Sequence, residues 1–263
     1  MKVKQARGWA GTIMSKISLR EQLFSDQFAT LIPCLRSDLN SVEPATNNAL
    51  RTAGSSTRSM GGSMLLGSVR LPVQFDSELE RRCVLQFLAD DDIVGIQLQA
   101  VRTPHRLIDG KTSTIWDVFV TLANGLRKLV SVKDFKVAAS DRYKALWREI
   151  CAGIPPGTAD VAQIYTQHHI DPVKVDTGNL FNIALTHDRP EAAELAYDFI
   201  IDENREMTIG QICAHLRRLR PVPMADHFLA LSTEFWAVVW LLAKRAVHLC
   251  AHDYIGMSTL VMP

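Results

Sequence analysis

Residues 115–134 read IWDVFVTLANGLRKLVSVKD, and this stretch decides the fold. Two apolar runs rich in β-branched residues flank the pair Asn124-Gly125, which favours a tight turn between antiparallel strands. We therefore expect strands over 115–122 and 126–135, joined by that turn into a β-hairpin.

The length of the turn determines which side chains share a face of this hairpin. A two-residue turn would set Asp117 opposite Val132, and the Asp117 side chain would then face away from Lys133. A three-residue loop, in which Gly125 adopts a left-handed conformation, instead sets Asp117 opposite Ser131. Asp117, Ser131 and Lys133 then lie on one face, so the chemistry considered below requires the three-residue loop.

Helix and strand patterns alternate on both sides of the hairpin. Upstream, Ser77 can cap a helix that continues to Leu88, and a strand-like stretch covers 93–101. Downstream, the pattern predicts an amphipathic helix over 141–150 and a short strand over 159–166. This order predicts an α/β fold with a mixed sheet flanked by helices.

The two ends of the chain differ from this middle part. Residues 1–69 begin with basic side chains and then turn to Ser, Thr, Asn and Gly, which favours a basic arm on a flexible linker. We expect order to resume at Asp76, within an α/β domain over 70–173. Residues 174–263 have a helical pattern that ends in a possible two-stranded hairpin, the outline of a winged helix. The helices predicted there are 190–201, 208–219 and 233–247.

Composition and charge narrow the class of protein. The chain has 263 residues and 47% hydrophobic residues, and its five cysteines show no spacing typical of a zinc ribbon or a disulfide framework. No apolar run approaches the roughly 20 residues that span a bilayer, so we expect a soluble cytoplasmic protein without a membrane partner. Residues 1–70 hold nine Lys and Arg against four Asp and Glu. This basic arm either contacts DNA phosphates or is a terminus that binds nothing. Its candidate DNA-binding residues are Lys2, Lys4, Arg7, Lys16 and Arg20.

Three ionisable residues occupy positions suited to a metal-dependent nuclease: Glu80, Asp117 and Lys133. A carboxylate between apolar residues, such as Asp117, is costly unless it is solvated, paired or bound to a cation. Carboxylates can hold the Mg²⁺ or Mn²⁺ that polarises a phosphate, and a nearby lysine can position or activate the water. Each residue also has a simpler interpretation. Ser77 and Glu80 match a helix capping box, and strand-end charges are usually solvated.

The joint order of several short motifs resembles the TnsA family, the endonuclease subunit of heteromeric transposases. These motifs are SELER, WDVFVTLANG and LVSVKD, then a helix, then a strand that ends in IYT and leads into HIDP. The resemblance covers residues 70–173 well and 190–263 in outline only. It implies a restriction-endonuclease-like core of the PD-(D/E)xK kind, followed by a winged-helix C-terminal domain.

The resemblance also implies roles for individual residues. Glu80 corresponds to the family's helix glutamate, Asp117 to its strand metal ligand, and Lys133 to its lysine. This chain departs from the family at Ser131, where the family has Gln or an acidic residue. Asp117, Glu80 and Ser131 are thus the candidate metal ligands, although a serine is a poor ligand for Mg²⁺. Either a backbone carbonyl and waters complete the shell, or metal binding is weak without DNA phosphates, or the enzyme is degenerate.

What the resemblance implies for function is hydrolytic nicking of the 5′ strand at transposon ends. A TnsB-like DDE transposase would cut and join the other strand, and a TnsC-like ATPase would regulate the assembly. The location would be the bacterial cytoplasm, with nucleoid association during activity. Two alternatives remain open: a stand-alone PD-(D/E)xK nuclease, and a non-enzymatic assembly factor with a decayed nuclease core, to which Ser131 points.

The helix predicted over 233–247 would be the recognition helix of a winged helix. Its basic residues, Lys244 and Arg245, lie at its far end, and residues 174–263 hold eight Lys and Arg against eleven Asp and Glu. This charge disfavours sequence reading in a DNA groove and favours docking on a protein partner.

Overall fold

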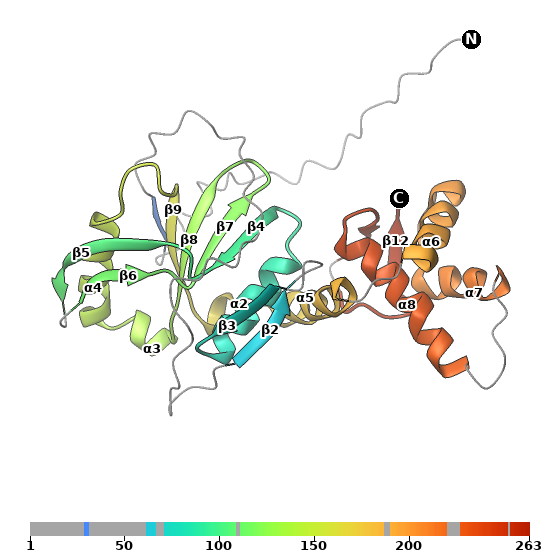
Figure 1. Ribbon diagram of the computed structural model, residues 1–263, viewed down its shortest axis with the longest axis horizontal. Coiled ribbons are helices and arrows are strands. Elements are labelled where there is room, and N and C mark those ends of the chain that lie inside the picture. The colour runs from blue at the N-terminus through green and yellow to red at the C-terminus, as the bar shows by residue number, and fades with distance from the viewer. Residues whose placement is uncertain are drawn as a thin grey trace, which may run out of the picture.

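The structure is a computed structural model that describes residues 29–31, 62–66, 71–108, 111–186, 190–219, 227–251 and 253–263. Figure 1 shows an α/β part and a mostly helical C-terminal part, with helix α5 (Pro172–Leu185) between them. The five basic residues of the predicted arm lie outside the described residues, so their contact with DNA stays a prediction.

A five-stranded mixed sheet forms the centre of the α/β part, in the order β1-β9-β8-β7-β4. Strands β4, β7 and β8 form an antiparallel meander, β9 runs parallel to β8, and β1 runs antiparallel to β9. The mixed α/β character predicted from the sequence is therefore confirmed. The strands are β1 (Ala29–Leu31), β4 (Ile93–Leu98), β7 (Val118–Leu122), β8 (Arg127–Val132) and β9 (Val161–Tyr165).

Helices cover both faces of this sheet because side chains along each strand alternate between two apolar cores. Helix α2 (Glu78–Leu88) packs on one face, while α3 (Phe135–Ala138) and α4 (Asp141–Ala152) pack on the other. On the α2 side lie Val118, Val120, Val130 and Val132. On the α4 side lie Phe119, Leu129, Trp147 and Ile150.

The register of the β7–β8 hairpin is the one that the three-residue loop predicts. Val118 pairs with Val130, and extending that register by one residue sets Asp117 opposite Ser131. The loop closes through a hydrogen bond of 2.8 Å from the Gly125 amide to the Leu122 carbonyl, and Gly125 has φ 82°. The left-handed glycine thus allows the three-residue loop, and the length of this loop decides which side chains share a face of the hairpin.

Two further hairpins were not predicted. Strands β2 (Gly62–Leu66) and β3 (Leu71–Phe75) pair antiparallel, and Leu66 is buried in the core beside α2. The expectation that order resumes at Asp76 is therefore wrong. The second hairpin, β5 (Arg102–Ile108) and β6 (Lys111–Ile115), is inserted between β4 and β7.

The predicted domain boundary at 173 falls inside a helix. A short 3-10 turn, η1 (Gln167–His169), leads to α5 (Pro172–Leu185), whose N-cap is Asp171. Helix α5 contacts both α2 and α8, so it belongs to both parts of the molecule. The close approach to α2 depends on Gly178, where a β-carbon would lie 1.8 Å from the carbonyl oxygen of Leu85.

The C-terminal part has its own apolar core, and its predicted helices and terminal hairpin are confirmed with shifted ends. Its small sheet has the order β10-β12-β11. Among the described residues, no helix is long and apolar enough to cross a bilayer. The elements are α6 (Pro190–Glu203), β10 (Met207–Thr208), α7 (Ile209–Leu219), α8 (His227–Ala243), β11 (His248–Leu249) and β12 (Leu260–Met262).

Arg245 connects the two parts of the molecule. It follows the end of α8 with φ 58°, and its Nη2 atom donates to the carbonyl oxygens of Asp90 at 2.8 Å and Ile93 at 2.6 Å. Asp90 lies in the connection between α2 and β4, and Ile93 is the first residue of β4. The guanidinium therefore binds the α/β part of its own chain.

Candidate active site

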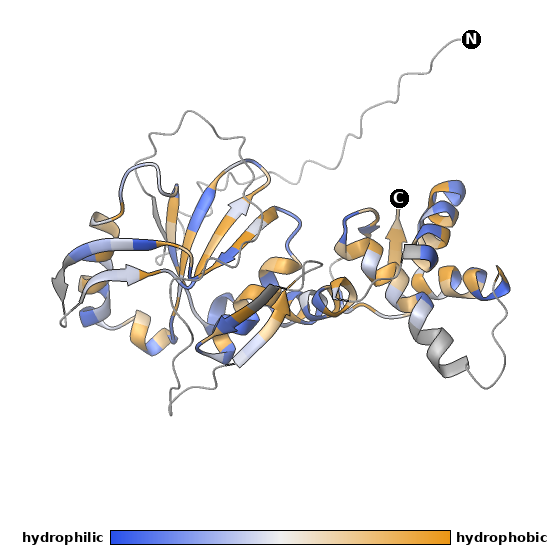
Figure 2. Cartoon of the chain, viewed as in Figure 1, coloured by the Kyte–Doolittle hydropathy of each residue, from blue (hydrophilic) through white to orange (hydrophobic). Residues whose placement is uncertain are grey.

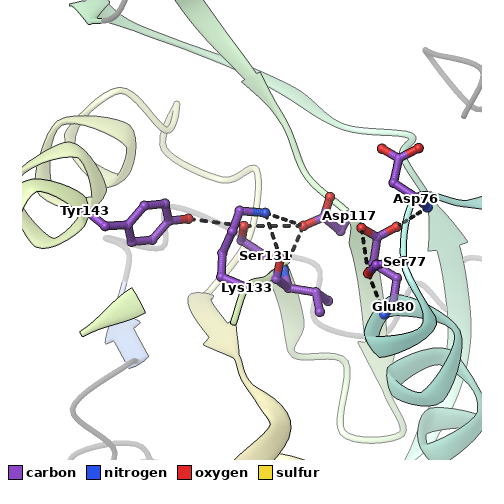
Figure 3. Close-up of polar contacts among 8 residues, drawn as sticks. Asp76, Ser77, Glu80, Asp117, Ser131, Lys133 and Tyr143 are labelled. Carbon is purple, nitrogen blue, oxygen red and sulfur yellow. Dashed lines mark hydrogen bonds and ion pairs between the residues drawn. The ribbon is translucent and has the colours of Figure 1, made fainter. Parts of the chain in front are cut away.

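Asp117 lies at the centre of a polar cluster at one end of the sheet (Figure 3). It directly precedes β7 and is only 5% exposed, so the alternative of a solvated strand start is wrong. Its Oδ2 atom accepts hydrogen bonds from the Val132 amide at 2.7 Å and from Lys133 Nζ at 3.2 Å. The backbone amide and the lysine together compensate for burial of the carboxylate.

Lys133 is the residue directly after β8, and its side chain extends into the cluster. Its Nζ donates to Asp117 and also to the Val132 carbonyl at 2.7 Å, while its side chain keeps 33% exposure. Burial lowers the pKa of Lys133, but the charge of Asp117, the hydrogen bond to it and the charges of Tyr143 and Glu80 together outweigh this effect, so the pKa is raised above its ordinary value. Lys133 therefore stays protonated and offers its charge to a group that arrives from solvent.

Glu80 lies in the first turn of α2. It takes part in capping this helix, and it also lies beside Asp117 in the site. Its amide donates to the Ser77 hydroxyl at 3.2 Å, and its Oε2 atom accepts from the Asp76 amide at 2.8 Å. The Glu80 side chain lies near enough to Asp117 for the charge of Asp117 to act on it (Figure 3). Burial, and then the charge of Asp117, raise the pKa of Glu80 to about 7.

Ser131 is buried on β8 and faces Asp117, as the register requires. Its hydroxyl donates to Asp117 Oδ2 at 3.4 Å, and it lies 3.5 Å from the hydroxyl oxygen of Tyr143. Tyr143 stands in the first turn of α4, which Ser140 caps. Sequence reasoning missed Tyr143 because it shares helical spacing with the buried Trp147, so its position is typical of a core residue.

Gln99 is a second residue that sequence reasoning missed. It follows β4 with φ 52°, its amide donates to the Asp117 carbonyl at 3.1 Å, and the whole residue is 1% exposed. Among the described residues its Oε1 atom has no hydrogen-bond partner. A left-handed, buried glutamine costs about 1 to 2 kcal/mol, and strain of this kind is typical of functional sites. The positive φ also ends the strand that the sequence predicts over 93–101.

The donor set fits a hard divalent cation with few protein ligands. Across the described ranges, no group of three or more His, Cys, Asp and Glu side chains is placed to hold a metal ion. The site offers two buried carboxylates, Glu80 and Asp117. Mg²⁺ is commonly bound by one or two carboxylates plus substrate phosphates and waters. Burial and then the charge of Asp117 raise the pKa of Glu80, and a divalent cation bound beside both carboxylates would favour their ionised forms.

The structure therefore brings together all four residues that the sequence predicts for the site: Glu80, Asp117, Ser131 and Lys133. It adds Tyr143 and places Gln99 beside Asp117 along the backbone. Comparison with known proteins gives no match, neither with a protein-family model nor with a curated protein.

Proposed function

We propose that this protein is a metal-dependent DNA endonuclease whose active site contains Glu80, Asp117 and Lys133. The observation that carries the proposal is the convergence of these side chains from α2, from the start of β7 and from the end of β8. A PD-(D/E)xK core is supported by the order α2, β4, β7, β8, α4, β9, in which β9 lies parallel to β8.

The charges of these side chains suggest a separate role in hydrolysis for each of them. Asp117 and Glu80 would hold Mg²⁺ or Mn²⁺, which when bound supplies Lewis-acid polarisation of the phosphate. Lys133, protonated and partly exposed, donates hydrogen bonds to the phosphate or to the attacking water. Glu80, whose pKa in the metal-free protein is raised to about 7, would have to lose its proton to hold the metal.

The proposed biological role follows the resemblance to the TnsA family. The protein would nick the 5′ strand at transposon ends, with a TnsB-like transposase and a TnsC-like ATPase as partners in the bacterial cytoplasm. The order α6, β10, α7, α8, β11, β12 and the sheet order β10-β12-β11 support a winged helix. Because Arg245 is engaged within the chain, we propose that this part docks on a protein partner.

A catalytically inactive assembly factor is the second candidate. Two observations favour it: Ser131 stands where the resemblance expects a stronger ligand, and Lys133 already pairs with Asp117. In such a protein the buried charges would stabilise a scaffold, and the transposase would need the protein without needing its chemistry.

The decisive experiment is a strand-specific cleavage assay. The full-length protein is incubated with a transposon-end duplex labelled on either strand, with Mg²⁺, and with or without the transposase. We expect a 5′-strand nick that requires Mg²⁺ and Asp117, with Asp117→Asn as the control for contaminating nucleases. Strong cleavage of plain duplex by the protein alone would favour a stand-alone nuclease. Assembly without any cleavage would favour the scaffold.

A further inference from the structure

We infer that the β5–β6 hairpin and helix α4 together form the surface that holds duplex DNA beside the active site. The inference rests on the proposed nuclease function and adds the place where the substrate lies. The hairpin leaves the sheet between Leu98 and Trp116, and Asp117 is the next residue. Figure 1 shows β5 and β6 reaching away from the central strands alongside α4.

The base of the hairpin is fixed against α4. Trp116 is buried and meets the Trp147 ring edge-on at 5.5 Å, and its Nε1 atom donates to the Thr103 hydroxyl at 3.1 Å. At the end of α4, a β-carbon on Gly153 would lie 2.0 Å from the Pro104 carbonyl oxygen. This close packing holds the ribbon in a defined direction relative to Asp117.

Charge in the α/β part is strongly divided, although the part as a whole is nearly neutral. Residues 99–158 hold ten Lys and Arg against five Asp and Glu. Residues 71–98 and 159–186, which include α2 and α5, hold three against nine. The cations of the hairpin are Arg102, Arg106 and Lys111, and those of α4 are Arg142, Lys144 and Arg148.

The basic side chains lie on elements that have polar surfaces. Arg102, Lys144 and Arg148 are exposed. Where Figure 2 colours the hairpin by hydropathy, it is mostly blue to near-white, without the continuous orange of a buried strand. The hairpin is thus a polar ribbon with a basic sequence, and this charge suits the binding of polyanions.

The dimensions favour DNA over RNA as the partner. Strand β5 has seven residues and so extends roughly 23 Å at the usual rise of a strand. The major groove of B-DNA, about 12 Å wide, admits a two-stranded ribbon, whereas the major groove of A-form RNA is deep and narrow. We therefore assign duplex DNA to this surface, with the backbone phosphates as the main contacts.

The experiment compares two triple variants of the full chain that remove equal charge. The hairpin variant is Arg102→Gln, Arg106→Gln and Lys111→Gln. The control variant, in the C-terminal part, is Arg205→Gln, Arg218→Gln and Lys244→Gln, all at exposed positions. Binding to a fluorescent mixed-sequence DNA duplex is measured over a range of KCl concentrations, with Ca²⁺ in place of Mg²⁺ to prevent cleavage. Thermal melting checks the fold of both variants.

We expect the hairpin variant to lose about 10- to 100-fold in affinity and its salt slope to fall by about two to three, with the control unchanged. The double variant Lys144→Gln, Arg148→Gln tests the same surface without altering the hairpin, and we expect a smaller loss of the same kind. Unchanged affinity and slope in the hairpin variant would overturn the inference. So would a wild-type protein that binds no duplex DNA, or one that binds an RNA duplex as tightly.

This test separates the surface from the chemistry. Hairpin-dependent binding by a protein that never cleaves would keep the surface and remove the proposed nuclease activity. Cleavage by a hairpin variant with wild-type affinity would keep the nuclease and remove the surface.

Discussion

A buried carboxylate pairs with a cation in each part of the molecule, and the two pairs are built differently. In the C-terminal part, Glu234 of α8 accepts a hydrogen bond of 2.7 Å from Nε of Arg217 in α7. In the α/β part, Asp117 accepts from Lys133 at the longer distance of 3.2 Å. The charge of a second buried carboxylate, Glu80, also acts on this lysine.

The difference lies in charge balance and in contact length. Glu234 and Arg217 form a one-to-one pair that joins two helices, as a structural ion pair does. The Asp117 cluster has two carboxylates for one lysine, and its contacts through Ser131 are 3.4 and 3.5 Å long. Burial alone therefore does not distinguish a structural acid from a functional one. An excess of negative charge makes Asp117 and Glu80 the candidates for a ligand-binding role, because such groups gain most from a bound cation.

The largest effect is expected from Asp117→Asn. We expect cleavage to fall about 1000-fold, since the proposed metal ligand is lost, with little change in melting temperature. The asparagine oxygen can still accept from the buried Val132 amide, which alanine would leave unpaired. Cleavage kinetics and thermal melting measure both quantities. A variant that unfolds would place Asp117 in the same structural class as Glu234.

Glu80→Gln is expected to stabilise the protein at alkaline pH while it impairs cleavage. The folded-state pKa of Glu80 is raised from 4.5 to about 7, so the folded state binds this proton more tightly than the unfolded state. Ionisation of Glu80 therefore lowers stability as pH rises from about 4.5 to 7, and the full loss persists above that range. Removing the charge should raise the free energy of unfolding by up to about 3 kcal/mol at pH 8.

The test of Glu80→Gln is how the difference in unfolding free energy between variant and wild type changes with pH. Urea unfolding in EDTA should give equal stabilities for wild type and variant near pH 4, since glutamine preserves the capping geometry. A stability gain that is independent of pH would show that the charge of Glu80 is not its cause.

Glu234→Gln should have the opposite effect. We expect a loss of about 2 kcal/mol in unfolding free energy, because Arg217 keeps its charge in a partly buried setting without its partner. Cleavage at temperatures below the transition should be unaffected. Glu203→Gln, which removes the exposed partner of Arg205, is the matched control and should change stability by less than about 0.5 kcal/mol.

The smallest effect is expected from Ser131→Glu. A carboxylate beside Asp117 should tighten Mg²⁺ binding about tenfold, as measured by calorimetric titration. Ser131→Ala, which adds no ligand, should bind Mg²⁺ as the wild type does. Equal affinities for all three proteins would mean that position 131 does not reach the metal.

The β7–β8 hairpin and the placement of Asp117 and Lys133 could be predicted because both follow from local rules. The turn signal at Asn124-Gly125 and the side-chain alternation fix the faces within one short stretch. Glu80 needed one additional fact, the resemblance of the motif order, because its distance from Asp117 depends on how α2 packs on the sheet.

Features that depend on tertiary contacts could not be predicted. Residues 172–185 have weak amphipathic character, and α5 packs against α2 through the close approach at Gly178. The Asp171-Pro172 pair was the available signal for its start. The β5–β6 ribbon lacks the apolar alternation of a strand that packs on a core. The conformation of Gln99 leaves no mark in the sequence.

The Ala123–Gly125 loop also limits how related sequences can differ in length. One residue inserted or deleted there would turn every side chain of β8 to the opposite face and separate Lys133 from Asp117. The insertion that holds β5 and β6 escapes this limit, because β4 and β7 pair directly whatever lies between them. A relative that keeps this site can therefore change the spacing of 16 residues from Asp117 to Lys133 only by an even number of residues. Gaps of any length in an alignment are tolerable within the ribbon, upstream of Trp116.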